Sequence, residues 1–496
     1  MRFAMPTTGS VRGLLAVAVL ALAAFQGMAQ RDRQPVRIGS DKQLFIDELL
    51  VVSRHNVELV MNPAQKTGER TIVPEHPWED FWAGGWNTIL EDEGTYKMWY
   101  DAASSEGAEK YFKRDPGRFV CYATSRDAIH WEKPKLGLIG FRGSKENNIV
   151  MTETTGTVFP DPRKADGNRF KYTGWWMGDR GLPGYEKKPG ELANLWIFTS
   201  PDGLTWKRLM DQPIMRGHFD TQNQIFWDDR IARWVAYVRL WEPLRKVGRS
   251  ETSDLQRWPK ARVVFGYDNQ DPVESDHYNA SVMQYPFAPN VYLMFPSPYF
   301  HYKGKRNDGP LDIQLATSRD GIQWNRLDRR PYVRLGPRGS FDGGSVYMSI
   351  GMVRRGDEIW MYYTGYDITH GDYDMKTTRK KGTVSRLVQR LDGFVSADAA
   401  WKGGELTTVP LVFSGHRLVL NVDTSAMGSA RVELMDEQGR PLPGFSAADC
   451  DPIDGNFTAR TVTWKGKPDL AGLAGKPAQL RFALRSTKLY AFQFLP

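Results

Sequence analysis

The sequence predicts an all-β protein, a five-bladed β-propeller followed by a C-terminal β-sandwich. Three observations support this prediction. A short turn motif recurs along the chain, two strand-like segments precede each copy, and the pattern changes to evenly spaced short strands after residue 398. Long amphipathic helical patterns are scarce, and β-rich runs are bounded by Gly, Pro, Asp and Asn, which is typical of an all-β fold.

The recurring turn motif is Thr-Ser-x-Asp-Gly-x-x-Trp or a close variant. Residues 317–324 and 199–206 carry it, 124–131 have Ala for Gly, 252–258 are a shortened copy and 390–394 a weaker relative. Each copy joins a strand to an Asp-Gly-type turn, the signature of a short hairpin. Recurrence at this scale predicts a repeat architecture. We expect the turn Asp side chains to bond local backbone groups and to be structural.

Two strand-like segments joined by a polar turn precede each copy of the motif. The predicted pairs are 86–90 with 96–100, 156–159 with 170–176, 224–227 with 234–239, 280–284 with 291–295, and 346–353 with 359–363. Five units of four antiparallel strands predict a five-bladed propeller. We expect residues 43–51 to supply or support the strand that closes the ring.

From about Asp398 the signals change to short alternating runs. These runs are 407–413, 417–421, 430–434, 461–464, 478–484 and 489–494. A set of roughly 100 residues with this pattern is typical of one β-sandwich. The predicted organisation is therefore a propeller over residues 30–397 and a sandwich over 398–496.

Residues 1–29 predict a secretory signal peptide. Arg2 and Arg12 form a positive start, 14–25 are a short apolar run, and 27–29 are a small-x-small cleavage site. We expect cleavage near Ala29 and export to the periplasm or the extracellular space. No later stretch approaches the length of a transmembrane helix, so no membrane segment is expected.

Charge and cysteine content narrow the classes of partner. The net charge is +8 with dispersed basic residues, whereas nucleic-acid binding needs a clustered basic face, so no nucleic-acid partner is expected. Cys121 and Cys450 are the only cysteines. We interpret them as two buried small hydrophobes, with a disulfide as the alternative. Metal-type Cys/His spacing is absent, so no cofactor is predicted, although a divalent cation in the channel would leave no signature. The sequence gives no indication of oligomeric state.

Catalytic candidates follow from propeller geometry. The innermost strand of each blade starts at one face of the central channel, and the second strand ends there. The second-strand ends carry Asp101, Arg239 with Glu242, and Asp367 with His370. The acids chosen as catalytic candidates lie at the first-strand starts, and they are Asp220, Asp276, Asp342, Asp80 and Glu153. Converging carboxylates raise each other's pKa, so that one stays protonated while another stays ionised. Glycoside hydrolysis requires such a pair.

Aromatic and polar residues at the same face are candidates for sugar binding. Rings stack on the apolar faces of a sugar, and Arg or Asn bonds its hydroxyls. The candidates are Trp82, Trp86, His218, Asn223, Arg239, Glu274, His277, Tyr278 and His370.

The five-blade pattern with channel acids and a trailing sandwich resembles the secreted propeller glycoside hydrolases. These are families 32 and 68, families 43 and 62, and family 130, with the C-terminal sandwich most similar to the family 32 arrangement. The resemblance covers the chain from about Gln43 onward and lies in the architecture and in the spacing of the turns between blades. The family 32 blade motifs themselves are absent. It implies acidic catalytic residues from the first blades and a pocket at the channel mouth.

The sequence therefore predicts a secreted glycoside hydrolase that cleaves a poly- or oligosaccharide with paired carboxylates. One alternative is a carbohydrate-binding propeller without catalysis. The other is a sialidase-like hydrolase, which needs an arginine triad and a nucleophilic Tyr. Arg239 is the one arginine that the sequence places at the channel face.

Overall fold

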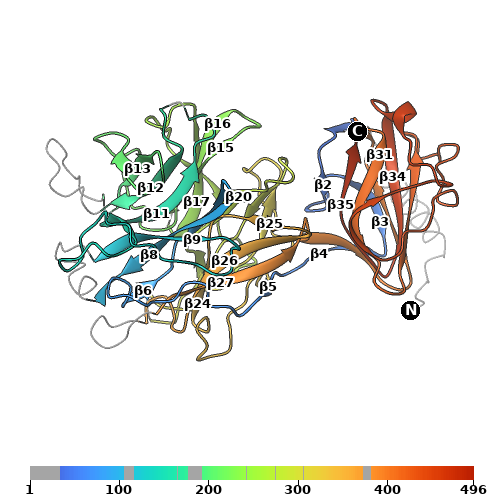
Figure 1. Cartoon of the computed structure of the whole chain (residues 1–496). Coiled ribbons are helices and arrows are strands. Elements are labelled where there is room, and N and C mark those ends of the chain that lie inside the picture. Colours follow the sequence, from blue (N-terminus) through green and yellow to red (C-terminus); the bar gives the residue numbers. More distant parts are fainter. Residues whose placement is uncertain are drawn as a thin grey trace, which may run out of the picture.

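The computed structural model describes residues 34–496 except 106–116, 165, 177–190, 192, 242, 274, 305–306 and 373–380. The predicted signal peptide and Glu274 lie outside the described residues. The described chain is all-β, as predicted, and its one named helical element is the short 3₁₀ turn Ala471–Leu473. No helix in the described ranges is long and apolar enough to cross a membrane. Figure 1 shows a larger body from the middle of the chain and a smaller body from its two ends.

The larger body consists of antiparallel sheets that follow one another along the chain. The first contains β6 (Trp82–Ala83), β7 (Thr88–Asp92), β8 (Thr95–Ala103), β9 (Arg118–Ser125) and β10 (Ile149–Thr152). The second contains β11 (Thr154–Pro160), β12 (Phe170–Trp176), β13 (Leu195–Ser200) and β14 (Lys207–Arg208). The third contains β15 (Gln224–Asp228), β16 (Arg233–Trp241), β17 (Arg245–Thr252) and β18 (Arg262–Phe265).

The fourth and fifth sheets complete the larger body. The fourth contains β20 (Val282–Gln284), β21 (Tyr292–Met294) and β23 (Ala316–Ser318), with the pair β19 (Ser275–His277) and β22 (Pro298–Phe300) nearby in sequence. The fifth contains β24 (Ser345–Met348), β25 (Val353–Arg355), β26 (Glu358–Tyr366), β27 (Thr383–Arg390) and β5 (Gln65–Lys66). Each predicted strand pair of the larger body coincides with observed strands to within a few residues.

Aromatic side chains pack each sheet against the next. Ring centroids are 5.5 Å apart for Trp99 and Phe170, which join the first and second sheets. They are 5.7 Å apart for Phe159 and Trp234, which join the second and third. Such pairs stabilise the contact beyond the area they bury. Neighbouring sheets cover both faces of the second sheet, which is why β12 and β13 are buried along almost their whole length.

The first and last sheets also contact each other. Trp131, just after β9, packs edge-on against Tyr362 of β26 with ring centroids 6.0 Å apart. A bridge between Thr88 and Ile350 joins the starts of the same two sheets. The sheets therefore follow a closed circuit in which the last returns to the first.

The recurring turns have the structural role that the sequence predicts. Asp202 Oδ1 accepts hydrogen bonds from the backbone N–H groups of Leu204 and Thr205, at 2.8 and 2.9 Å. Asp127 and Asp320 make the same pair of bonds in their own turns. Each carboxylate thus satisfies backbone donors that the turn would otherwise leave unpaired.

The Gly of the turn motif permits docking against the neighbouring sheet. Trp99 Nε1 donates to the Gly203 carbonyl at 2.7 Å, and the Tyr237 hydroxyl donates to the Gly321 carbonyl at the same distance. Gly203 has φ +79°, and a Cβ there would lie 2.6 Å from the Trp99 ring. Only Gly combines this conformation with so close an approach.

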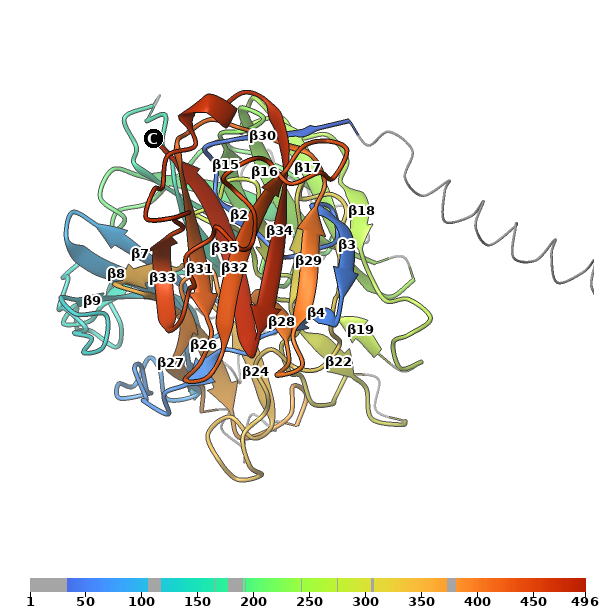
Figure 2. The ribbon, with the colours of Figure 1, turned by 90° about the vertical axis from the view of Figure 1, so that its right-hand side faces the viewer.

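The smaller body contains two six-stranded sheets that both ends of the chain build (Figure 2). One consists of β33 (Asn456–Thr461), β31 (Arg417–Asp423), β35 (Thr487–Leu495), β28 (Val395–Ala399), β4 (Val57–Met61) and β2 (Gln43–Leu44). The other consists of β1 (Val36–Gly39), β30 (Leu411–Phe413), β34 (Pro477–Arg485), β29 (Gly404–Thr408), β3 (Val51–His55) and β32 (Ser429–Met435).

One expectation about the N-terminal segment is wrong. Residues 43–51 do not close the circuit of the larger body, because β2 pairs with β35 and β3 with β29. The reason is hydrophobic: Phe45 is buried and packs against Phe482 and Phe492 at 6.0 and 5.7 Å. The strand that completes the fifth sheet is β5, whose Lys66 pairs with Leu387.

Cys121 and Cys450 are both buried and free. Cys121 lies in β9 of the larger body, and Cys450 lies in the smaller body, where its Sγ accepts a hydrogen bond from the Val432 amide at 3.2 Å. The interpretation of the two cysteines as small buried side chains without a disulfide is confirmed.

Candidate active site

A cavity of about 430 Å³ lies where the second strands of four sheets end. Its lining consists of Trp82, Gly85, Trp86, Asp101, Arg118, Trp175, His218, Asp220, Arg239, Trp241, Arg245, Tyr278, Asn307, Tyr347, Tyr366 and His370. Asp101 is near the end of β8, Trp175 of β12, Arg239 of β16 and Tyr366 of β26. We refer to this cavity as the central pocket.

Asp101 is the buried carboxyl group of the central pocket. Burial raises its pKa to about 7, against the opposing charge of Arg118 and the polar groups of Thr155 and Trp82. Gly85 lies against it: a Cβ at Gly85, whose φ is +131°, would be 3.3 Å from Asp101 Oδ2. The missing side chain lets the backbone close over the carboxyl group. Near pH 7 this group can therefore hold a proton and release it.

Asp220 is the second carboxylate of the pocket, and its surroundings are different. Its side chain is partly exposed, it forms an ion pair with Arg239, and its Oδ2 lies 3.1 Å from His218 Nε2. Burial and the charges of Arg239 and Arg245 lower the pKa of His218 to about 4. The imidazole is thus neutral at pH 7. A guanidinium in contact favours the ionised form of the Asp220 carboxylate.

Arg245 is held in place from behind by Asp276. Its Nη1 donates to Asp276 Oδ2 at 2.9 Å, and its Nη2 donates to Asn307 Oδ1 at 3.2 Å. His301 Nε2 lies 3.4 Å from the other oxygen of Asp276. Asp276 is only 1% exposed, so its role here is to position the arginine.

Aromatic rings form much of the pocket wall. Trp241 stacks with His218 at an interplanar angle of 17°. Tyr278 packs against His370 with ring centroids 4.3 Å apart, and the Tyr347 hydroxyl is 2.6 Å from His370 Nδ1. Rings of this kind supply flat apolar surfaces beside polar groups, the usual composition of a small-molecule site.

The structure brings together about half of the predicted site residues. Those that line the central pocket are Asp220, Trp82, Trp86, His218, Arg239, Tyr278 and His370. All lie at first-strand starts or second-strand ends, as the propeller rule predicts.

The three leading predicted acids do not meet in one site. Asp276 lies behind Arg245, as described above. Asp342 accepts hydrogen bonds from Lys66 Nζ at 2.7 Å, Tyr363 at 2.8 Å and Ser340 at 2.8 Å. It is turned toward the strand that completes the fifth sheet, and it does not line the central pocket. The expectation of a site built from Asp220, Asp276 and Asp342 is therefore replaced by one that contains Asp101 and Asp220.

Four further predicted residues lie away from the central pocket. Asp80 is bound by the amide and hydroxyl of Ser105, at 2.6 and 2.5 Å. Glu153 has φ +59° between β10 and β11, and burial raises its pKa. The Asn223 amide donates to the backbone carbonyls of Phe219 and Thr221. His277 is buried against Phe265, with ring centroids 4.8 Å apart.

Sequence reasoning missed residues at the starts of third strands. Arg118 begins β9 and pairs with Ala103 at the end of β8. Arg245 begins β17 and pairs with Trp241 at the end of β16. In an antiparallel sheet the start of strand three lies beside the end of strand two. That rule, applied to the sequence, would have found both arginines.

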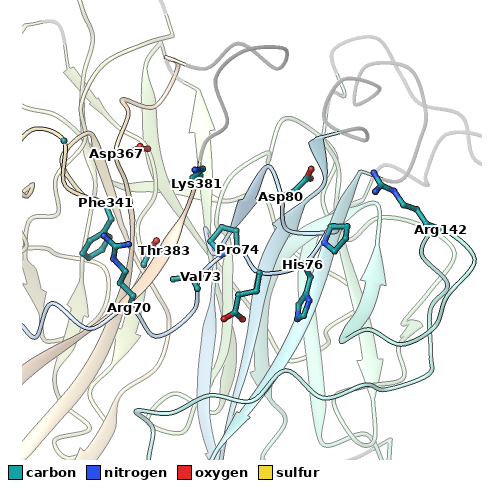
Figure 3. A pocket seen from close by; sticks show the side chains of 13 residues that line it. Arg70, Val73, Pro74, His76, Asp80, Arg142, Phe341, Asp367, Lys381 and Thr383 are labelled. Carbon is teal, nitrogen blue, oxygen red and sulfur yellow. The ribbon is translucent and has the colours of Figure 1, made fainter.

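A larger cavity of about 770 Å³ lies beside the first and fifth sheets (Figure 3). Asp80, Arg142, Asp367 and Lys381 are among its lining residues. Among its described lining residues, Asp80 is the one predicted site residue. The central pocket, which gathers seven, is therefore the better candidate for the active site.

No group of three or more His, Cys, Asp or Glu side chains in the described ranges is placed to hold a metal ion. The described residues therefore suggest no position for the divalent cation considered from the sequence.

No protein-family model matches the chain. Over 155 residues it is 21% identical to an A type blood N-acetyl-α-D-galactosamine deacetylase of Flavonifractor plautii, covering 28% of this chain and 20% of that protein. Over 123 residues it is 28% identical to an uncharacterised protein of Mycobacterium tuberculosis, covering 24% of this chain and 32% of that protein. The chain thus matches only about a fifth to a third of the length of these relatives.

Solved structures with a similar chain path include carbohydrate-active enzymes. An N-acetylgalactosamine deacetylase from F. plautii is 14% identical with a TM-score of 0.47, covering 68% of this chain and 96% of that one. A thermostable family 43 glycoside hydrolase is 14% identical with a TM-score of 0.43, covering 67% and 95%. A family 32 β-fructofuranosidase from Bombyx mori is 11% identical with a TM-score of 0.42, covering 88% and 96%. Families 32 and 43 are among those that the sequence resembles. The function proposed below rests on the central pocket itself.

Proposed function

We propose that this protein is a glycoside hydrolase that works with Asp101 as general acid and Asp220 as base or nucleophile. The observation that carries the proposal is the contrast between two carboxyl groups of one pocket. Asp101 is buried with a pKa raised to about 7, whereas Asp220 is paired with Arg239 and His218. Two carboxyl groups whose surroundings drive their protonation apart are suited to acid and base roles.

In this mechanism Asp101 donates its proton to the glycosidic oxygen as the bond to the anomeric carbon breaks. The ionised Asp220 either attacks that carbon or takes a proton from the water that attacks it. Arg239 stabilises the ionised form of Asp220 through their ion pair. At the end of the cycle a water molecule has been divided between the two products and both carboxyl groups have regained their starting charge.

Other pocket residues suit a sugar ring. Trp86 offers a flat face for stacking, and Asn307 and the arginines offer donors to hydroxyl groups. The lining mixes apolar rings with a few polar groups, as binding sites for small polar ligands generally do.

The larger and the smaller body can each be assigned an architecture. We interpret the five sheets of the larger body as the blades of a propeller, because aromatic contacts link successive sheets and the last contacts the first. The two sheets of the smaller body would be a sandwich around a shared hydrophobic core. Export through a signal peptide ending near Ala29 fits a polysaccharide substrate outside the cytoplasm.

The test is an activity panel with the full chain. Nitrophenyl glycosides of common pyranoses and furanoses, together with plant, algal and microbial glycans, are incubated with wild type, Asp101→Asn and Asp220→Asn. We expect wild type to cleave at least one substrate, Asp220→Asn to lose most of that activity, and Asp101→Asn to lose most of it on the glycans, whose leaving groups need protonation. Asp211→Asn, whose side chain is 90% exposed, is the matched control and should keep it.

Two outcomes would contradict the proposal. If no substrate is cleaved but some are bound, the protein is a carbohydrate-binding propeller. If cleavage survives in both variants but is lost in Asp80→Asn, the active site is the larger cavity of Figure 3.

A further inference from the structure

The central pocket gathers three arginine side chains, Arg118, Arg239 and Arg245, and we infer that it binds a sugar bearing an oxyanion, either a carboxylate or a sulfate. The inference rests on the proposed function for the identity of the pocket as a sugar site. It goes further by naming the substrate class as acidic.

The arginines are fixed by stacking on tryptophan rings. The guanidinium carbons of Arg239 and Arg245 lie 5.0 and 4.5 Å from the centroid of the same ring, Trp241. That of Arg118 lies 4.8 Å from Trp82 and 5.3 Å from Trp175. A guanidinium held over an aromatic ring is pre-organised to present its N–H groups to a carboxylate or sulfate. Because Arg239 and Arg245 share one ring, their charges converge on a single region of the wall.

Among the described residues of the pocket wall, positive charge exceeds negative charge. Three guanidinium groups line it, together with the carboxyl groups of Asp101 and Asp220. Asp276 balances Arg245 from behind and is almost completely buried. Near pH 7 Asp101 carries only part of a negative charge, because burial raises its pKa to about 7.

Burial and the positive charge of the pocket wall lower the pKa values of His218 and Arg239. The charges of Arg239 and Arg245 contribute, after burial, to the low pKa of His218. Burial and repulsion from Arg245 lower the pKa of Arg239 to about 9, although the charges of Tyr278 and Asp276 oppose the shift. The Nε atoms of Arg239 and Arg245 are buried and have no hydrogen-bond partner among the described residues. Each of these guanidinium groups thus has one carboxylate partner and spare hydrogen-bonding capacity.

A bound anion would give these guanidinium groups a second charged acceptor. A charge-assisted hydrogen bond to a carboxylate or sulfate is about twice as strong as a neutral one. A neutral sugar would offer these arginines only hydroxyl groups. The geometry at Trp241 therefore favours an acidic sugar over its neutral counterpart.

The test compares sugars that differ only in charge. D-glucuronate against D-glucose and D-galacturonate against D-galactose are titrated calorimetrically into the full chain, with D-galactose 6-sulfate as the sulfate arm. We expect each acidic sugar to bind about tenfold more tightly or better than its neutral partner. The difference should shrink as the salt concentration rises. Relative affinity for the uronates and the sulfated sugar shows which oxyanion the pocket prefers.

Arginine variants test whether the preference for acidic sugars depends on Arg245. Arg245→Gln should reduce the preference to less than about threefold, and Arg245→Lys should keep part of it because the charge remains without the fork. Arg257→Gln removes the charge of a side chain that is 91% exposed, and it should behave as wild type. Circular dichroism checks that each variant is folded. If Arg245→Gln does not fold, the wild-type comparison of charged and neutral sugars decides alone.

The outcomes separate this inference from the hydrolase proposal. Equal or tighter binding of neutral sugars overturns the inference, and the hydrolase proposal then stands if neutral aryl glycosides are cleaved. Binding of acidic sugars without cleavage of any aryl glycoside, uronides included, supports the inference and overturns the hydrolase. Absence of binding by all five sugars overturns the inference.

Discussion

The two ends of the sheets in the larger body hold their carboxylates in different ways. At the turn end, Asp202 and Asp320 bond backbone N–H groups two and three residues ahead, within their own turns. At the pocket end, Asp101 and Asp220 depend on side chains that come from elsewhere in the chain, chiefly Arg118 and Arg239. The first arrangement is local, and the second requires the complete fold.

The protonation of the two sets differs accordingly. Burial raises the pKa of Asp320, but hydrogen bonds from the Gln323 and Ile322 backbone and the Ser318 hydroxyl, with the charge of Arg249, together outweigh it, so the pKa is lowered. Burial also raises the pKa of Asp101, and there the opposing groups are too weak, so the pKa reaches about 7. A carboxylate that completes a turn is fixed in its ionised form, whereas one in the pocket is poised to exchange a proton. Repetition in the sequence therefore marks the structural acids of the turns and not the acids of the central pocket.

Removal of the pocket acid should have the largest effect. Asp101→Asn should lower kcat/KM by roughly 10²- to 10⁴-fold for substrates with poor leaving groups, because they need protonation of the leaving oxygen. Nitrophenyl glycosides need less help and should lose less. Steady-state kinetics with a matched pair of substrates measures the difference.

Asp320→Asn is the partner variant at the other end of a sheet. It should change kcat/KM by less than about twofold, since surface turns distant from a site seldom affect its chemistry. The comparison fails if Asp320→Asn is as inactive as Asp101→Asn.

The pH dependence of the activity should report Asp101 directly. An acid with a raised pKa is protonated below that pKa, so kcat/KM should fall as the pH rises above about 7. The charge of Arg118 lowers this pKa, so Arg118→Gln should move the falling limb to higher pH. A falling limb that does not move in Arg118→Gln would assign it to another group.

The fold was largely predictable because its signals are local. Hairpin turns, alternating runs and the switch of pattern near Asp398 each depend on a few adjacent residues. The sheet that the N-terminal strands join could not be predicted in this way. Phe45 is buried by Phe482 and Phe492, which are more than 400 residues away in sequence. A partner at that distance leaves no mark in the segment itself.

The candidate site was predictable in place but not in composition. The rule that first-strand starts and second-strand ends meet at the channel located Asp220, Arg239 and Tyr278. It could not show that Asp342 turns toward Lys66 and Tyr363, or that Asp276 serves Arg245. The direction of a side chain within a loop depends on tertiary partners, which the sequence alone does not specify.

Asp342 offers a test of that distinction with a smaller expected effect. Asp342→Asn should keep kcat/KM within about threefold of wild type but reduce the free energy of unfolding by roughly 1–3 kcal/mol, because Lys66 loses its charged partner. Urea denaturation measures the stability, and the aryl-glycoside assay measures the activity. Loss of activity at unchanged stability would return Asp342 to the catalytic site.

Effects on stability alone are expected at the glycine position of the turns, where two copies of the motif differ. Gly203→Ala places a Cβ 2.6 Å from the Trp99 ring at φ +79° and should cost roughly 1–3 kcal/mol of stability. The first copy already has Ala128 at this position, with φ +62°. Ala128→Gly relieves backbone strain but removes a buried methyl group, so stability should change by less than about 1 kcal/mol. Equal effects of the two substitutions would mean that contact with the neighbouring sheet does not determine the residue at this turn.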